Sequence, residues 1–117
     1  MNHADIRQHC LSLPGATRDI KWQVDEVFSI GGKMFCVMCS DPAHSAGVSF
    51  KVDPERFLEL TDQPGVIPAP YLARHHWVRI DHPGVVAEEA LADLLTHAYR
   101  LVRAKLPKKL RDGLPPV

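Results

Sequence analysis

The sequence lacks a net charge. Its 117 residues include 14 basic and 14 acidic side chains, with histidines counted as neutral. Dedicated nucleic-acid binders usually carry a basic excess, so nucleic-acid binding here would need an uneven distribution of charge. Aromatic residues are few, at 7%, whereas the hydrophobic (45%) and charged (24%) fractions are ordinary for one globular domain.

The sequence also lacks long apolar runs. No stretch approaches the roughly 20 apolar residues of a membrane-spanning helix, and the first ten residues, MNHADIRQHC, have no apolar core of a secretory leader. The three cysteines are an odd number, which argues against a disulfide framework. We therefore expect a cytoplasmic protein without membrane association, folded as one domain over residues 1–117. A monomer is favoured, although the sequence does not determine the oligomeric state.

Catalytic and cofactor-binding motifs are absent. The sequence contains no phosphate-binding loop, dinucleotide fingerprint or nucleophile elbow. The Gly-Gly-Lys at Gly31–Lys33 lacks the spacing of a phosphate-binding loop and is typical of a hairpin turn, because glycine tolerates positive φ. We expect neither enzyme activity nor a cofactor.

The C-x-x-C motif from Cys36 to Cys39 raises the question of metal or redox chemistry. The motif falls in a predicted strand, where residues three apart point to opposite faces of the sheet. No second C-x-x-C completes a four-ligand zinc site. Buried core cysteines are therefore the favoured interpretation.

The histidines give no metal-binding pattern either. His75 and His76 are adjacent on a predicted strand, so their side chains should face opposite ways. Asp93 and His97 are four residues apart on a predicted helix, which favours a surface ion pair over half of a metal site.

The order of elements predicts an antiparallel sheet with helices. Apolar alternation predicts strands at residues 20–24, 27–30, 34–39, 47–52 and 75–81. Capping residues and apolar periodicity predict helices that begin at Asn2, Asp53 and about Ala87. Short links between strands, with helices before and after them, indicate an α+β fold in which the helices cover one face of the sheet.

The segment YLARHHWVRI, from Tyr71 to Ile80, bears most on function. Strand alternation assigns Val78 and Ile80 to the core and groups His75, Trp77 and Arg79 on the other face. An aromatic side chain with basic neighbours on an open sheet face can stack on bases and contact phosphates. The alternative is that Trp77 is buried under a loop such as VIPAPYL, since tryptophan is highly buried on average.

The C-terminal part of the chain is basic. Six basic residues and no acidic residue lie between Arg100 and Arg111. This segment can contact phosphates, or it can complement the dipole at a helix C-terminus and keep the protein soluble.

Four segments together resemble the MmcQ/YjbR family of small bacterial proteins. They are CLSLPGA (Cys10–Ala16), GGKMF (Gly31–Phe35), HHWVRID (His75–Asp81) and YRLVRAKLPKKLRDGL (Tyr99–Leu114). The resemblance spans nearly the whole chain and implies a two-layer, CyaY-like (frataxin-like) sandwich with a double-wing arrangement that binds DNA. The family's His-Trp corresponds to His76 and Trp77, and its Leu-Pro-Lys-Lys-Leu to Leu106–Leu110.

These observations predict a non-enzymatic, DNA-binding domain that uses wing hairpins and its basic C-terminal segment. The expected nucleic-acid-binding residues are Lys33, Lys51, His75, Trp77, Arg79, Lys105, Lys108, Lys109 and Arg111. The second hypothesis is a protein-interaction or small-ligand module that uses the open sheet face around Trp77, and a metal-binding protein is the third.

Overall fold

The computed structural model describes residues 1–117 and contains one six-stranded sheet with four α-helices. The strands are β1 (Thr17–Lys21), β2 (Asp25–Ile30), β3 (Lys33–Cys39), β4 (Val48–Lys51), β5 (Val66–Pro68) and β6 (Trp77–Ile80). The α-helices are α1 (His3–Ser12), α2 (Pro54–Thr61), α3 (Glu88–Arg103) and α4 (Lys108–Asp112), with two 3₁₀ turns at Ala73–His75 and Pro83–Val85.

The strands pair antiparallel throughout, in the order β1-β2-β3-β4-β6-β5. The α+β class and the helix-covered antiparallel sheet predicted from the sequence are confirmed. Two strands are corrected, because β1 spans Thr17–Lys21 rather than residues 20–24 and β6 begins at Trp77 rather than His75. A further strand, β5, was not predicted.

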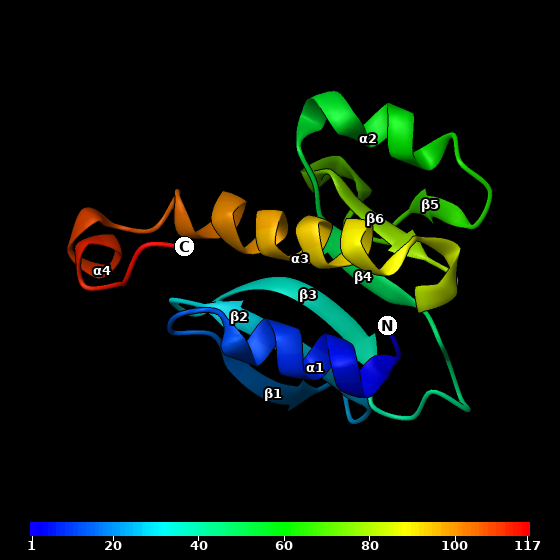
Figure 1. Ribbon diagram of the computed structural model, residues 1–117, viewed down its shortest axis with the longest axis horizontal. Coiled ribbons are helices and arrows are strands. Elements are labelled where there is room, and N and C mark those ends of the chain that lie inside the picture. Colours follow the sequence, from blue (N-terminus) through cyan, green and yellow to red (C-terminus); the bar gives the residue numbers. More distant parts are fainter.

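The helices cover one face of the sheet. Figure 1 shows α3 crossing the middle of the molecule, with α1 on one side of it and α2 on the other. A core of 22 buried residues lies between these helices and the sheet. At its centre the rings of Phe35 and Tyr99 meet edge to face, 5.6 Å apart, and the Tyr99 hydroxyl donates to the carbonyl oxygen of Pro14. The opposite face of the sheet carries no helix.

The β2–β3 hairpin turns at Gly31 and Gly32, as the sequence predicts. Their φ angles of 59° and 78° lie in the left-handed region, which glycine enters without steric cost. A β-bulge between Phe28 and Ser29 of β2 shifts the register against β3. As a result the successive residues Phe35 and Cys36 are both completely buried in the core.

A buried ion cluster joins α1 to the sheet. The Glu26 carboxylate on β2 is fully buried and accepts two hydrogen bonds from Arg7 of α1, at 2.6 and 2.8 Å, and one from Arg18 of β1, at 2.6 Å. Burial alone would raise the pKa of Glu26, but the hydrogen bonds and charges of the two arginines outweigh it and hold that pKa below its usual range.

The helix starts agree with the capping chemistry only in part. Asn2 and Asp5 form a reciprocal capping box at the start of α1. Asp53 occupies the N-cap position of α2 but makes no capping hydrogen bond, because its carboxylate contacts His97 of α3 instead. The predicted pairing of His97 with Asp93 is therefore wrong, and His97 links two helices.

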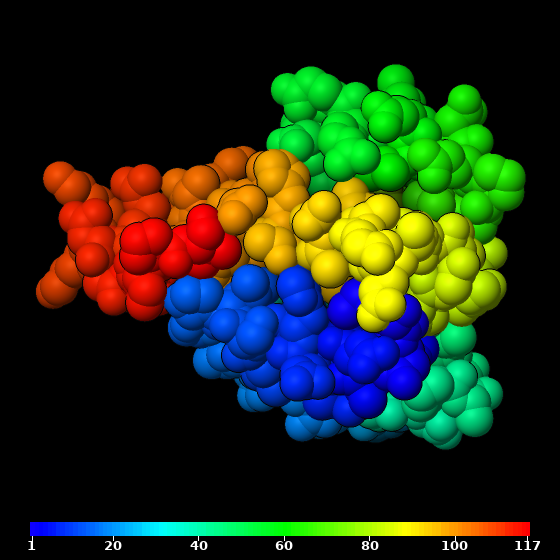
Figure 2. Space-filling model, viewed as in Figure 1, coloured from blue at the N-terminus to red at the C-terminus, as the bar shows by residue number.

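The C-terminal segment projects from one end of the molecule. Figure 2 shows residues beyond α3 standing out from the globule, and none of the side chains of α4 is buried. None of the helices is both long and apolar enough to cross a membrane.

Candidate functional site

The helix-free face of the sheet, here called the outer face, carries a row of side chains across three strands. Val37 of β3 pairs with Ser49 of β4, and Ser49 pairs with Arg79 of β6. Cross-strand partners point to the same face of a sheet. Since Val78 and Ile80 belong to the core, as predicted, this row faces away from it.

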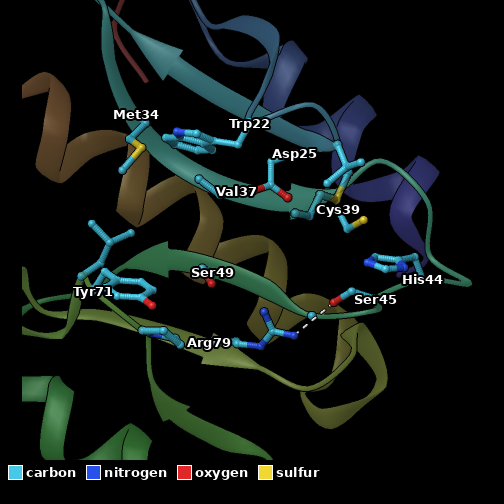
Figure 3. A pocket seen from close by; sticks show the side chains of 15 residues that line it. Trp22, Asp25, Met34, Val37, Cys39, His44, Ser45, Ser49, Tyr71 and Arg79 are labelled. Atoms are coloured by element: carbon cyan, nitrogen blue, oxygen red, sulfur yellow. Dashed lines mark hydrogen bonds between the residues drawn. The ribbon is translucent and has the colours of Figure 1, made fainter.

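This row forms the floor of a groove of about 600 Å³, here called the outer groove. The volume lies within the range of about 300–1,000 Å³ found for small-molecule sites. Figure 3 shows Trp22 and Tyr71 on opposite sides of the groove, with the Arg79 side chain between them and Ser45. The outer face is therefore hollowed rather than flat.

Arg79 is held in one orientation within the groove. Its Nη2 donates a hydrogen bond of 3.1 Å to Ser45 Oγ, and the guanidinium lies against the backbone of Gly47, where a β-carbon would come within 2.2 Å of Nη2. No carboxylate oxygen lies within the 4.0 Å of an ion pair, since the four ion pairs of the protein all involve other residues. The guanidinium is therefore a preorganised cation that an external anion can reach.

Two exposed aromatic side chains form the rims of the groove. Trp22, in the β1–β2 connection, is 63% exposed, and Tyr71, in the β5–β6 connection, is 99% exposed. Their φ angles of 51° and 65° lie in the left-handed region, which is uncommon for bulky side chains. The positive φ of Trp22 continues at Gln23, at 74°, as in the tight turn of a β-hairpin, and this turn presents the indole at the edge of the groove.

A second surface forms at the projecting end of the molecule. Gly31, at the tip of the β2–β3 hairpin, lies against the Leu106 side chain, which a β-carbon at Gly31 would approach to 2.7 Å. This contact places the hairpin beside the C-terminal segment. The exposed cations of these two segments, here called the basic end, are Lys33, Lys105, Lys108, Lys109 and Arg111.

The remaining predicted binding residues lie elsewhere. Lys51 is half-buried and its Nζ donates a 2.8 Å hydrogen bond to the carbonyl oxygen of His75. Burial, followed by the charge of Lys105, lowers the pKa of Lys51. His75 is exposed in a 3₁₀ turn, and His76 has a φ of 61°. The strand alternation predicted for these two histidines is therefore wrong.

Trp77 is only 4% exposed. It pairs with Lys51 on the outer face, as strand alternation predicts, but it does not line the outer groove. The chain from β5 returns beside it, since the backbone N–H of Ala69 donates to the carbonyl oxygen of Trp77. Of the two alternatives, the buried tryptophan is the one observed, and no base can stack on a side chain in that position.

The C-x-x-C cysteines diverge as expected from a strand. Cys36 lies in the core, whereas Cys39 lines the outer groove. Contact with the Cys10 thiol and complete burial raise the pKa of Cys36 well above its usual range, so it is a neutral thiol. No group of three or more His, Cys, Asp or Glu side chains could hold a metal ion.

Comparison with known proteins identifies the family. The YjbR family pattern matches residues 11–101. The chain belongs to the YjbR family. Among solved structures it is similar to a Deinococcus radiodurans protein with a DUF419 domain, at 31% identity and a TM-score of 0.85, over 97% of this chain and 89% of the other.

A Pseudomonas syringae protein has the same fold at 19% identity, with a TM-score of 0.70 over 87% of this chain and 99% of that one. No curated protein matches the sequence. The resemblance to the YjbR family inferred from the four sequence segments is thus confirmed, and the function of the site has to be argued from its geometry.

Sequence reasoning did not identify Trp22 and Tyr71, which line the outer groove of this YjbR protein. Both lie in connections rather than strands, so no alternation pattern reports which way they point. The sequence placed Trp22 inside the strand predicted at residues 20–24, whereas β1 ends at Lys21 and Trp22 lies in the turn that follows it. Single exposed hydrophobic side chains are common at protein surfaces, so neither residue type marks a binding surface by itself.

Proposed function

We propose that this YjbR protein is a non-catalytic DNA-binding protein that contacts the phosphate backbone through the basic end. The contact between Gly31 and Leu106 carries the proposal, because it brings the β2–β3 hairpin, with Lys33, beside the C-terminal segment that carries the other cations. In this arrangement the hairpin acts as a wing beside α4.

The charge distribution supports this proposal despite the neutral total. The six basic residues between Arg100 and Arg111 offset an equal excess of acid in the rest of the chain. The protein is therefore strongly polarised along the sequence, and Asp112 is the single acidic residue of α4. A surface of this kind contacts phosphates without reading bases, so binding is weak, tolerant of sequence and sensitive to salt.

We also propose that the protein acts in the cytoplasm as a monomer. Its three cysteines are unpaired and buried, which suits a reducing compartment. Light scattering after gel filtration measures the oligomeric state, and a mass near 13.1 kDa is expected.

Binding should be measured with labelled duplex DNA and with one of its strands, by fluorescence anisotropy at about 50 mM and about 200 mM salt. We expect micromolar binding at the lower salt that weakens at the higher. The double variant Lys108→Glu/Lys109→Glu should bind more weakly, and its plot of log affinity against log salt should be shallower by about 2, since two phosphate contacts are lost.

The matched control is Lys21→Glu/Arg74→Glu, which makes the same change in charge at two exposed positions outside the basic end. It should retain most of the affinity and the original salt slope. Equal losses in the two double variants would mean that only the total charge matters, and absence of binding at low salt would overturn the proposal outright.

A further inference from the structure

We propose that the outer groove is a separate site for a small planar heteroaromatic anion, such as a nucleoside monophosphate or a heteroaromatic carboxylate. The ring would lie between Trp22 and Tyr71, and its anionic group would meet Arg79. The groove is on the outer face of the sheet, whereas the basic end lies at the hairpin tip and α4, so the two sites do not share residues.

Arg79 accounts for the anionic group. It is the one basic residue that lines the groove besides His44, and it has no acidic partner within ion-pair distance. Its hydrogen bond to Ser45 leaves other N–H groups of the guanidinium free, and a guanidinium presents its donors in a planar fork that fits carboxylate and phosphate oxygens. The Ser49 hydroxyl, from the adjacent strand, lies on the same floor.

The aromatic rims account for the ring. Trp22 and Tyr71 project from opposite sides of the groove (Figure 3), and both are more exposed than large aromatic side chains usually are. A planar ligand that enters between them shields both faces at once. Stacking of that kind adds to the area buried and prefers flat, polarisable rings.

Asp25 limits which aromatic rings the outer groove can bind. Figure 3 shows its carboxylate among the groove side chains, and it has no ion-pair partner. A carboxylate in that position accepts hydrogen bonds and repels a second anion, which favours a ring with an N–H donor and a single anionic end. Aminopurines and indoles satisfy this requirement, whereas purely hydrocarbon rings do not.

The experiment uses four probes and isothermal calorimetry on the full chain. Adenosine monophosphate and indole-3-acetate carry both ring and anion, and adenosine and indole carry the ring alone. We expect at least one of the two anions to bind, and to bind about ten- to hundredfold more tightly than its uncharged counterpart, because one charge-assisted contact to Arg79 is lost. Binding of adenosine monophosphate alone would indicate a phosphate ligand, and binding of indole-3-acetate alone would indicate a carboxylate ligand.

Gly47→Ala is the most selective variant. Its backbone does not require glycine, since its φ lies outside the left-handed region, and the three atoms nearest to an added β-carbon all belong to the Arg79 guanidinium, at 2.2 to 2.7 Å. The side chain of Arg79 can move away, so the protein should fold with an unchanged melting temperature. The guanidinium then leaves its position, and affinity for the anionic probe should fall about tenfold or more.

Gly113→Ala is the matched control, because a β-carbon there makes only ordinary contacts, the nearest at 3.7 Å. Arg79→Met should reproduce the loss seen with Gly47→Ala, and Trp22→Ala and Tyr71→Ala should weaken all probes that bind. Leu58→Ala, at another exposed apolar side chain, should change nothing.

Three results would overturn the proposal. One is that no probe binds at millimolar concentration, and another is that the uncharged probes bind as tightly as the anions. The third is that Gly47→Ala weakens DNA binding as much as Lys108→Glu/Lys109→Glu does, which would make the groove part of the DNA surface. If the unmodified protein binds an anionic probe but binds no DNA at low salt, the proposed function is refuted and the groove site stands.

Discussion

Replacing Arg7 by Met is expected to destabilise the protein by about 2–3 kcal/mol, although Arg7 itself is partly exposed. The reason lies with its partner, because the Glu26 carboxylate is fully buried and receives two of its three hydrogen bonds from Arg7. Removal of one partner of a buried ion pair costs about 3–5 kcal/mol. The expected loss is smaller here because Arg18 remains and because the Arg7 side chain is 35% exposed. Urea denaturation measures it.

The surface pair Arg56–Glu59 provides the control for this substitution. Its atoms are 3.7 Å apart, both side chains are exposed, and the residues are three positions apart on α2. Arg56→Met should therefore cost no more than about 0.5 kcal/mol. If Arg7→Met and Arg56→Met had the same small effect, the Glu26 cluster would contribute no more than an ordinary surface pair.

Glu26 also makes a specific prediction about acid stability. The pKa of Glu26 is depressed in the folded protein. Its ionisation therefore contributes fully to the free energy of unfolding above about pH 4.3, the usual pKa of an unfolded glutamate. The contribution is lost as the pH falls below that value towards the folded pKa. In Glu26→Gln, the slope of unfolding free energy against pH should flatten in this window, while the slope at neutral pH should not change.

His3 also makes the folded protein less stable as the pH falls, but at a higher pH than Glu26. Burial is the main reason that its pKa lies below the usual value, and its Nε2 has no hydrogen-bond partner. The folded state therefore resists protonation of His3, and stability falls as the pH drops below about 6.5. The two side chains affect stability in different pH ranges. His3→Gln should therefore flatten the plot of unfolding free energy against pH below about 6.5, and Glu26→Gln should flatten it below about 4.3.

Local chemistry explains which parts of the fold could be predicted from the sequence. The Gly31–Gly32 turn, the Asn2 cap and the long helix α3 each depend on residues close together in the chain, and each is found as expected. The family resemblance was also confirmed, because it depended on the order of four segments and not on any contact between them.

Long-range contacts explain what could not be predicted. β5 has only three residues, and it becomes a strand because it pairs with β6, which follows it in the chain. The segment before β6 folds into a 3₁₀ turn, with His76 in the left-handed region. His75 and His76 therefore lie outside the strand, and the alternation of side chains between the two faces of the sheet does not apply to them. Leu58 is as apolar as its neighbours in α2 but is exposed, because the core contacts of that helix come from Phe57 and Leu60.

The candidate site shows the same limit. Arg79 was correctly assigned to the face away from the core, because that inference needs only the alternation within β6. The rims of the groove come from two connections that are distant in sequence, and nothing in either connection reports that the other lies across from it. Alternation within β6 therefore placed Arg79 correctly, whereas the structure buries Trp77 outside the groove and places Trp22 along it.

The two tryptophans should behave as opposites when each is replaced by alanine. Trp77→Ala is expected to cost about 3–5 kcal/mol of stability, because the side chain is 4% exposed and its removal leaves a cavity on the outer face of the sheet. Trp22→Ala should cost less than about 1 kcal/mol, since the side chain is 63% exposed and its backbone conformation is no less accessible to alanine. Thermal and urea unfolding compare the two variants directly.

Acrylamide quenching tests the same contrast without loss of the fold. With Trp22 replaced by Phe, the remaining Trp77 fluorescence should be nearly insensitive to acrylamide, whereas with Trp77 replaced by Phe the signal of Trp22 should be readily quenched. An anionic probe that enters the outer groove should then protect Trp22 and leave Trp77 unchanged. If instead Trp77 were the quenchable residue, the wall of the groove would be wrongly assigned, and the ligand site would have to be sought around β5 and β6.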